Sequence, residues 1–362
     1  MAGSIINLTR GMPPPEVFPT EDLVQCGEAA LRRDPDVLLQ YGRSPGYAPL
    51  REWLGQQYGV GPDQVLIGNS SLEIFSFVTQ TLLRPGDRAF VESPSYDRSI
   101  TLLRRAGAQV VGIPMEEDGM DMTVLEEELK QGLPALMYLI TDFHNPTGIT
   151  TSLEKRRRLA ALAEEHGFWI AEDAPYRLLR YGGQGVSTLW SLAPERVVHM
   201  SSFSKVLAPG LRLGYVLGPA EAIATLVKWA VDTYIGPVFP TQGMVYEYCR
   251  RGLLESNIER LKEVYRPRLQ IALSALGRHV PEATWPRPEG GFYVGVTVPE
   301  GGDMASLLVR AEGAGLRLSD GRGFFPNPPD GNRFLRIPFC SVTPEEIEEG
   351  VSRLARLLKN NP

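Results

Sequence analysis

The stretch SSFSKVLAPGLRLGY occupies residues 201–215 and follows the short, mostly apolar run VVHM at 197–200. An apolar run of that length predicts a buried strand, so Lys205 is expected in the loop just beyond a strand end. Alone, such a lysine is most simply a solvated loop residue. Its neighbours argue for more, because Ser202, Ser204 and Arg212 supply hydroxyls and a guanidinium fork that suit a phosphate group.

Two further polar motifs precede this stretch, each beside a predicted strand. The tetrad NPTG begins at Asn145, and Asp173 and Tyr176 follow the apolar run FWIA at 168–171. A lysine amine can form a Schiff base, and a carboxylate can keep a pyridine nitrogen protonated so that the ring acts as an electron sink. Asn145 and Tyr176 can bond the phenolic oxygen of that ring. Together with the phosphate-binding groups, this set predicts a site for pyridoxal phosphate (PLP).

On these motifs the chain resembles the fold-type I PLP-dependent enzymes, the class I/II aminotransferases. The branch that it resembles most acts on 2-aminoadipate or on several substrates, including branched-chain and aromatic amino acids. The resemblance extends from Gly11 to Ile337. It implies an aminotransferase that moves an amino group from an amino acid to a 2-oxo acid through an aldimine of PLP with Lys205.

Strand-like and helix-like segments alternate over about 150 residues, an order typical of an α/β fold with a doubly wound, mostly parallel sheet. Right-handed crossovers place the loops after the strands along one edge, where open α/β sheets bind ligands. Beyond a long helical stretch near 241–269, segments 291–298 and 333–339 predict strands of a smaller α+β domain. The resemblance adds the N-terminal segment to that smaller part. The predicted domains are a large PLP-binding domain at 37–264 and a small domain made of 1–36 and 265–362.

The composition of the 362-residue chain is that of a globular protein, with 43% hydrophobic and 22% charged residues. A net charge of -6 argues against nucleic-acid binding, and no apolar stretch is long enough to cross a bilayer. Residues 1–7 lack the basic and apolar segments of a secretory signal. Cys26, Cys249 and Cys340 have no metal-ligand spacing, so we expect no metal site, buried thiols and a cytoplasmic protein.

The resemblance makes Lys205, Asp173 and Tyr176 the expected catalytic residues. Lys205 should hold the cofactor and then move the proton of the substrate Cα. Asp173 has two candidate roles, to pair with the pyridine nitrogen or to cap a helix that begins at Pro175. The first is favoured, because a carboxylate after four apolar residues needs a partner to offset its desolvation. Tyr176 and Asn145 should bond the phenolic oxygen, although an Asn at this position also suits an ordinary turn.

The phosphate of the cofactor is expected where a predicted strand meets a helix, at Ser70 and Ser71. Backbone N–H groups at a helix start form an anion site. Relatives usually read GSQQ here, whereas this chain reads SSLE at 70–73, so Leu72 should contribute through its backbone alone. Tyr96 matches the aromatic residue that stacks on the pyridine ring, although a core tyrosine remains the alternative. The expected cofactor-binding residues are Ser70, Ser71, Leu72, Tyr96, Asn145, Asp173, Tyr176, Ser202, Ser204, Lys205 and Arg212.

The substrate carboxylate is expected at Arg336, in the apolar segment FLRIP. An arginine there needs a partner, so it either forms a structural ion pair or binds the α-carboxylate bidentately, as the resemblance implies. Asn145, Gly11 and Arg10 complete the expected substrate-binding set. Relatives commonly have a small residue in place of Arg10, and His144 and Arg322 also depart from the family pattern. Each of these three either faces the substrate side chain or is simply solvated.

The resemblance also implies a homodimer with shared active sites, because in relatives the tyrosine at the place of Tyr41 reaches the phosphate in the neighbouring subunit. A buried core aromatic is the alternative for Tyr41. We therefore expect the partners to be amino acid and 2-oxo acid substrates and a second copy of the chain, without nucleic acid or membrane.

Two rival functions remain open at this point. A PLP enzyme of the same fold could catalyse elimination, substitution, cyclisation or decarboxylation, since its cofactor residues would be identical. A regulator with an aminotransferase-like sensing domain would carry an N-terminal winged helix-turn-helix. The family motif begins by Gly11 and the pI is near 5.5, so a regulator is disfavoured.

Overall fold

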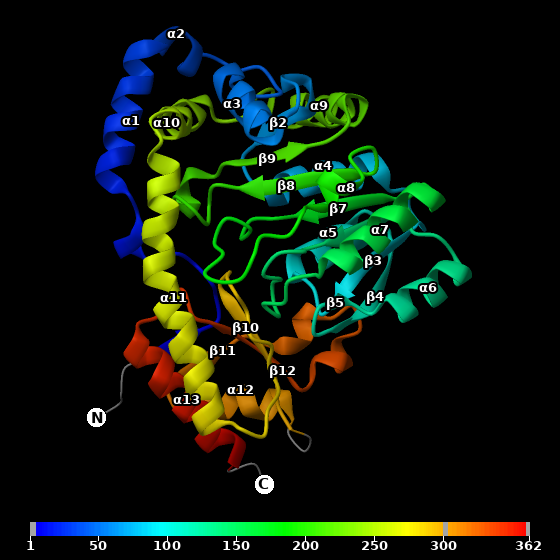
Figure 1. Ribbon diagram of the computed structural model, residues 1–362, viewed down its shortest axis with the longest axis vertical. Coiled ribbons are helices and arrows are strands. Elements are labelled where there is room, and N and C mark those ends of the chain that lie inside the picture. Colours follow the sequence, from blue (N-terminus) through cyan, green and yellow to red (C-terminus); the bar gives the residue numbers. More distant parts are fainter. Residues whose placement is uncertain (1–4, 300–302, 360–362) are drawn as a thin grey trace.

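The computed structural model describes residues 5–299 and 303–359 (Figure 1). Residues 1–4 and 360–362, the two ends of the predicted small domain, lie outside the described part, as do residues 300–302. In the described part, one large sheet has the strand order β2-β9-β8-β7-β6-β3-β4-β5. Its strands are β2 (Val65–Gly68), β3 (Arg88–Ser93), β4 (Gln109–Glu116), β5 (Gly119–Met120), β6 (Leu136–Leu139), β7 (Trp169–Asp173), β8 (Val197–Ser202) and β9 (Gly214–Leu217).

This large sheet is mostly parallel, as the alternation of segments predicts. The five strands β3, β4, β6, β7 and β8 run parallel to one another. At the two edges, β9 is antiparallel to both β2 and β8, and β5 is antiparallel to β4. All residues of β6 and β8 are buried. A strand covered on both faces is mostly apolar, so β6 reads as a continuous apolar run, whereas β8 also holds the buried polar residues His199, Ser201 and Ser202.

Helices cover both faces of the large sheet (Figure 1). Successive strand residues point to opposite faces, so Tyr138 and Ala171 join the apolar cluster that contains residues of α4, α5 and α9. Met137 and Ile170 join the cluster that contains residues of α6, α7 and α8. The two sets of helices are α4 (Ser71–Leu82), α5 (Asp97–Arg105) and α9 (Ala220–Tyr234) on one face, and α6 (Met122–Gln131), α7 (Leu153–His166) and α8 (Leu189–Leu192) on the other.

The N-terminal and C-terminal segments meet in a smaller part of the molecule, at the bottom of Figure 1. β1 (Ile6–Leu8) pairs in parallel with β11 (Leu316–Leu318). β10 (Tyr293–Thr297) pairs antiparallel with β12 (Phe334–Pro338), so both strands expected there are present. α12 (Met304–Gly313) and α13 (Pro344–Lys359) complete this part.

The long helical stretch expected near 241–269 is two helices rather than one. α10 (Phe239–Arg250) ends before Gly252, whose φ of 70° is left-handed, and α11 (Leu253–His279) starts directly after it. A left-handed glycine ends a helix at little steric cost, which explains the break. α11 then runs from beside the large sheet into the smaller part (Figure 1), so the predicted domain boundary at 264/265 falls inside this helix.

Short helices complete the described chain, and in it no helix is both long and apolar enough to cross a membrane. The remaining α-helices are α1 (Thr20–Arg33), α2 (Pro35–Leu38) and α3 (Ala48–Tyr58). The 3-10 helices are η1 (Pro15–Val17), η2 (Pro62–Gln64), η3 (Pro209–Leu211), η4 (Gly321–Phe324) and η5 (Pro328–Gly331).

Candidate active site

A cavity of about 510 Å³ lies where the loops after the parallel strands converge. Ser70 reaches it from the end of β2, Tyr96 from the loop after β3 and Asn145 from the loop after β6. Asp173 ends β7, and Lys205 follows β8. The cavity therefore occupies the carboxyl edge of the sheet, where α/β proteins of this kind bind their ligands.

The residues expected in the site lie together around this cavity, with one exception. Tyr41 is 82% exposed and does not line the cavity in the described part of the chain. His144 is fully buried, with Nδ1 at 2.9 Å from Thr147 Oγ1 and Nε2 at 3.1 Å from Glu92, so it neither lines the cavity nor is solvated and both alternatives for it are wrong. Arg322 pairs with Asp320 (2.7 Å) and does not line the cavity. The expected residues that line it are Arg10, Gly11, Ser70, Ser71, Leu72, Tyr96, Asn145, Asp173, Tyr176, Ser202, Ser204, Lys205, Arg212 and Arg336.

Lys205 presents a half-buried amine to the cavity, without a hydrogen-bond or ion-pair partner among the described residues. In the described part of the chain, its Nζ makes no hydrogen bond or ion pair, and lies 5.8 Å from the ring centre of Tyr176 and 5.9 Å from that of Phe292. Burial lowers the pKa of the Lys205 amine. A lysine held in this way has a larger neutral fraction, which is the nucleophilic form.

Asp173 is a buried carboxylate with one satisfied and one open oxygen. Its Oδ2 accepts a hydrogen bond from Tyr138 Oη (2.7 Å), whereas Oδ1 has no partner in the described part of the chain. Burial raises the pKa of Asp173 to about 6, against the opposing effects of Tyr138 and Lys205. Residues 174–178, all described, form a turn rather than a helix, so the alternative that Asp173 caps a helix at Pro175 is wrong.

One end of the cavity is built to receive an anion. Ser70 Oγ accepts from Glu73 N (3.1 Å) and caps α4, whose first N–H groups have no partner within the helix. A Cβ atom on Gly214 would lie 2.4 Å from Ser71 N, so only glycine lets β9 approach this helix start so closely. On the other side, Ser202 Oγ accepts from Ser204 N (3.1 Å) and donates to Leu213 O (3.0 Å), which fixes the loop before Lys205.

The opposite end carries Arg336, which is anchored without a carboxylate. Arg336 Nη1 donates to Asn145 Oδ1 (3.0 Å) and Nη2 donates to Thr9 O (2.6 Å). Its guanidinium lies 4.7 Å from the ring centre of Tyr293 and 4.6 Å from that of Phe324. In the described part of the chain Arg336 has no ion pair and its Nε has no partner, so the alternative of a structural ion pair is wrong. The guanidinium is thus held in place and still able to bind an anion.

The residues present fit PLP. An open carboxylate oxygen, a half-buried amine and an anion site at a helix start surround one cavity, at Asp173, Lys205 and Ser70. These groups match the pyridine nitrogen, the aldehyde carbon and the phosphate of that cofactor.

Comparisons with known proteins agree with this fit. The family described as "Aminotransferase class I and II" matches residues 4–354. The chain is 37% identical over 360 residues to the 2-aminoadipate transaminase of Thermus thermophilus, with 98% of this chain and 90% of that protein covered.

The chain belongs to the class I and II aminotransferases.

Two solved aminotransferases superimpose on this one over nearly its whole length. The α-aminoadipate aminotransferase of Thermus thermophilus, complexed with N-(5'-phosphopyridoxyl)-L-leucine, gives a TM-score of 0.93 at 36% identity and covers 98% of this chain and 92% of its own. The multiple substrate aminotransferase of Thermococcus profundus gives a TM-score of 0.95 at 32% identity, with 99% and 92% covered. The fold is therefore that of fold-type I PLP enzymes, as predicted from the sequence.

The family and these relatives also decide the reaction. The aminotransferase uses PLP to move an amino group from an amino acid to a 2-oxo acid. The relatives favour this transfer over the elimination, substitution, cyclisation or decarboxylation that the cofactor residues alone leave open.

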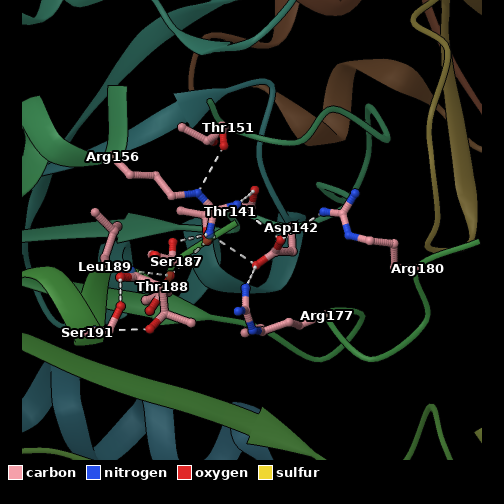
Figure 2. Close-up of polar contacts among 12 residues, drawn as sticks. Thr141, Asp142, Thr151, Arg156, Arg177, Arg180, Ser187, Thr188, Leu189 and Ser191 are labelled. Atoms are coloured by element: carbon pink, nitrogen blue, oxygen red, sulfur yellow. Dashed lines mark hydrogen bonds and ion pairs between the residues drawn. The ribbon is translucent and has the colours of Figure 1, made fainter. Parts of the chain in front are cut away.

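A buried ionic cluster holds two loops of the aminotransferase site in place. Figure 2 shows the guanidinium groups of Arg156, Arg177 and Arg180 gathered around Asp142. Arg156 donates to both Asp142 oxygens (3.1 and 3.2 Å), and Arg177 donates to Oδ2 (2.9 Å). Asp142 lies three residues before Asn145, and Arg177 directly follows Tyr176. The same carboxylate therefore fixes the positions of both residues expected at the phenolic oxygen.

Several residues of the site were not expected from the sequence. Tyr293 Oη lies 3.5 Å from Tyr176 Oη and 3.5 Å from Gly11 O, and a Cβ on Gly11 would lie 2.4 Å from the Tyr293 ring. The side-chain alternation along the strand predicted at 291–298 could have placed Tyr293 on the same face as the site. Tyr138 had no such signal, because a tyrosine in an apolar run is usually a core residue. The further lining residues are Thr9, Met12, Phe75, Asp97, Arg98, Ser99, Ile140, Pro175, Pro209, Ser319, Asp320, Gly323 and Phe324.

Proposed function

We propose that Lys205 holds PLP and then carries the proton between the substrate Cα and the cofactor. The observation that carries this proposal is the half-buried Lys205 amine, which makes no hydrogen bond or ion pair in the described chain and shares a cavity with the open oxygen of Asp173. When bound, PLP supplies an electron sink for the negative charge that develops at Cα. A lowered pKa enlarges the neutral fraction of Lys205, and the neutral amine can accept that proton and return it on the other side of the transfer.

The proposed task of Asp173 is to keep the pyridine nitrogen protonated. Its open oxygen would accept the N–H, and its other oxygen is already bonded to Tyr138. Tyr176 and Asn145 would bond the phenolic oxygen, and Tyr96 would cover one face of the ring. All of them line the cavity, which supports this arrangement.

The proposed phosphate site combines the backbone of Ser70, Ser71 and Leu72 with Arg212. Free N–H groups of a first helical turn attract a dianion, and the helix dipole adds to that attraction. Arg212 lines the cavity, and its φ of 49° places it in the left-handed region at the end of η3. Ser202 and Ser204 supply hydroxyls at the loop that leads to Lys205.

At the substrate end, we propose that Arg336 binds the α-carboxylate, with Asn145 and Gly11 beside it. The side chain of the substrate would then extend towards Arg10. Arg10 lines the cavity, is exposed, and makes no side-chain hydrogen bond or ion pair with another described residue. A free cation favours a substrate with an acidic or polar side chain, which is consistent with the 2-aminoadipate named for a relative.

A decisive test of this function is incubation of the PLP-loaded enzyme with a panel of amino acids. We expect the cofactor absorbance to change to that of the aminated form, and mass spectrometry to detect the matching 2-oxo acid. Adding a second 2-oxo acid should restore the original absorbance. Release of carbon dioxide, a lost side-chain group or a cyclic product instead of an oxo acid would contradict the proposal.

We further propose a homodimer in which Tyr41 reaches the phosphate of the partner's cofactor. Tyr41 and Leu39 are exposed, and so are Ile235 and Val238. The two segments adjoin, since a Cβ on Gly236 would lie 2.0 Å from Gly42 O. The Val238 backbone also donates to Asn69 Oδ1 (3.1 Å), one residue before Ser70, so this apolar surface borders the proposed phosphate site.

Mixing of subunits tests the dimer. Tyr41→Ala and Lys205→Ala enzymes should each have low activity, and a hybrid dimer would contain one site free of both lesions. After statistical exchange, we expect up to about a quarter of wild-type activity to return. If subunits exchange, as mass spectrometry can show, and no activity returns, Tyr41 acts in its own subunit or not at all.

We make two further proposals, on the domain division and on the cellular location. The division into a large domain at 37–264 and a small domain at 1–36 and 265–362 remains our proposal; the pairing of β1 with β11 supports it. We also propose a cytoplasmic location, because Cys26, Cys249 and Cys340 are all buried and form no disulfide.

A further inference from the structure

Tyr138 is a buried phenol that contacts the site without lining the cavity. It lies on β6, where it pairs with Ala171 of β7, and Asp173 lies two residues further along the same face of β7. The hydroxyl of Tyr138 donates to Asp173 Oδ2 over 2.7 Å, and the ring packs against Phe75 of α4 with centroids 4.6 Å apart. Tyr138 is therefore held from both sides, and its hydroxyl has a fixed direction.

We propose that Tyr138 is a positioning residue that orients Asp173 and keeps it ionised, so that one defined oxygen is left for the pyridine nitrogen of PLP. This inference rests on the proposed role of Asp173. A carboxylate on a strand end can rotate about its last bond, and either oxygen could then face the cavity. The hydrogen bond from Tyr138 commits Oδ2, which leaves Oδ1 as the open oxygen.

A phenol suits this task better than another donor. Burial raises the pKa of Tyr138 well above its ordinary value, so the hydroxyl stays neutral and donates at every pH at which the enzyme works. A hydrogen bond to the charged form of an acid favours that form. The donor thus opposes the burial that raises the pKa of Asp173 to about 6.

The other groups that act on Asp173 are more distant. Lys205 and His199 favour its ionised form through charge, and Tyr96 lies close enough for Asp173 to affect the pKa of its phenol. In the described part of the chain, none of these three makes a hydrogen bond to Asp173. Tyr138 is therefore the group whose removal should change Asp173 most.

Tyr138→Phe is the test, because it deletes one oxygen and leaves the ring in the core. The measurement is the equilibrium affinity of the apoenzyme for PLP from pH 5 to pH 9. Without the donor, the pKa of Asp173 rises, and a protonated carboxyl cannot pair with a protonated pyridine. We expect about tenfold weaker PLP binding at neutral pH and an upward shift of about one unit in the pH at which affinity falls. The matched control is Tyr248→Phe. Tyr248 is a buried phenol on α10 that does not line the cavity, so this variant should change neither the PLP affinity nor the pH at which affinity falls.

A second variant keeps the test informative if Tyr138→Phe folds poorly. Fluorotyrosine at position 138 has a more acidic hydroxyl, which donates more strongly and should shift the midpoint to lower pH. Shifts in opposite directions for the two variants support the proposal, whereas an unchanged midpoint in either folded variant overturns it. An equal loss of affinity in Tyr248→Phe also overturns it. If Asp173→Asn itself binds PLP and turns over normally, the proposed role of Asp173 fails, which is a separate result.

Discussion

Glu172 and Asp173 are consecutive carboxylates on β7 that point to opposite faces of the same sheet. Both are buried, yet their surroundings differ completely. Asp173 has one donor and one open oxygen, and burial raises its pKa to about 6. Each of the two carboxylate oxygens of Glu172 has two hydrogen-bonding partners. The groups that contact its two oxygens are Thr141 Oγ1 (2.8 Å), Leu189 N (2.9 Å), Trp190 N (3.1 Å) and His199 Nδ1 (2.8 Å).

The pKa values of the two acids move in opposite directions for this reason. Burial alone would raise the pKa of Glu172, but the contacts with His199 and the backbone of Leu189 lower it well below the ordinary value. Asp173 lacks such compensation on its cavity side. A buried carboxylate left half-satisfied is unfavourable for the apoenzyme, and this marks it as a group kept for a ligand. Glu172, by contrast, serves the fold.

The largest effect should come from removing the amine that shares the cavity with Asp173. Lys205→Ala deletes the attachment point of the cofactor and the proton carrier together, so turnover should fall by at least about 10⁴-fold. Circular dichroism should remain that of the wild type, because the Lys205 amine makes no hydrogen bond or ion pair in the described chain and lies 5.8 and 5.9 Å from the nearest ring centres. In the wild type, borohydride should fix PLP on Lys205, as peptide mass spectrometry can show. A Lys205→Ala enzyme with near-normal turnover would eliminate the proposed mechanism.

Asp173→Asn tests the role of the β7 carboxylate that lines the cavity. A neutral amide cannot keep the pyridine nitrogen protonated, so we expect turnover to fall by roughly 10³-fold and PLP to bind more weakly. The apoenzyme should behave oppositely. Because the folded pKa of Asp173 is raised, its ionisation destabilises the apo fold as pH rises from about 4 to about 6, by on the order of 3 kcal/mol.

The amide removes that pH-dependent destabilisation. Apo Asp173→Asn should therefore unfold at the same or a higher denaturant concentration than the wild-type apoenzyme at pH 8. A marked loss of apo stability in this variant would mean that the carboxylate supports the fold, as Glu172 does.

Glu172→Gln should show the reverse pattern. The new NH₂ group would face donors, the N–H of Trp190 and His199 Nδ1, so the fold should lose about 3 kcal/mol at neutral pH. The folded pKa of Glu172 is depressed, so its contribution is present above the ordinary pKa of 4.5 and is lost as pH falls below it. The free energy of unfolding, measured with denaturant, should therefore decrease less steeply from pH 7 to pH 3 for the variant than for the wild type. The PLP affinity of the folded variant should equal that of the wild type. A loss of PLP affinity without a loss of stability would mean that Glu172 serves the cofactor, as Asp173 does.

Sequence patterns predicted most of the residues that line the cavity, because these residues follow strand ends. In a parallel sheet those ends share one edge, so Asn145, Asp173 and Lys205 converge whatever the exact register. The hydrogen bond from Tyr138 to Asp173 could not be predicted, because it depends on the register of two neighbouring strands. The break at Gly252 was missed because glycine inside an apolar helical pattern does not always end a helix.

Arg336 and Arg10 repeat the contrast between a fixed and a free group at the substrate end. Arg336 is held by Asn145 and Thr9 and should bind the α-carboxylate that all substrates share. Lysine offers a point charge and loses the planar fork. Arg336→Lys should lower kcat/KM by roughly 10- to 100-fold, and by a similar factor for every amino acid in a panel. A loss confined to some side chains would assign Arg336 to side-chain recognition.

Arg10→Ala should give the smallest and the most selective effect. The side chain of Arg10 is exposed and makes no hydrogen bond or ion pair with another described residue, so its removal should leave the unfolding midpoint nearly unchanged. An exposed cation acts weakly and over a distance, so kcat/KM for acidic or polar amino acids should fall about three- to tenfold, with little change for apolar ones. The loss should shrink at high salt, because screening weakens an exposed charge, and Arg10→Lys should keep most of the preference. A uniform loss across the panel, unaffected by salt, would place Arg10 with Arg336 at the α-carboxylate instead.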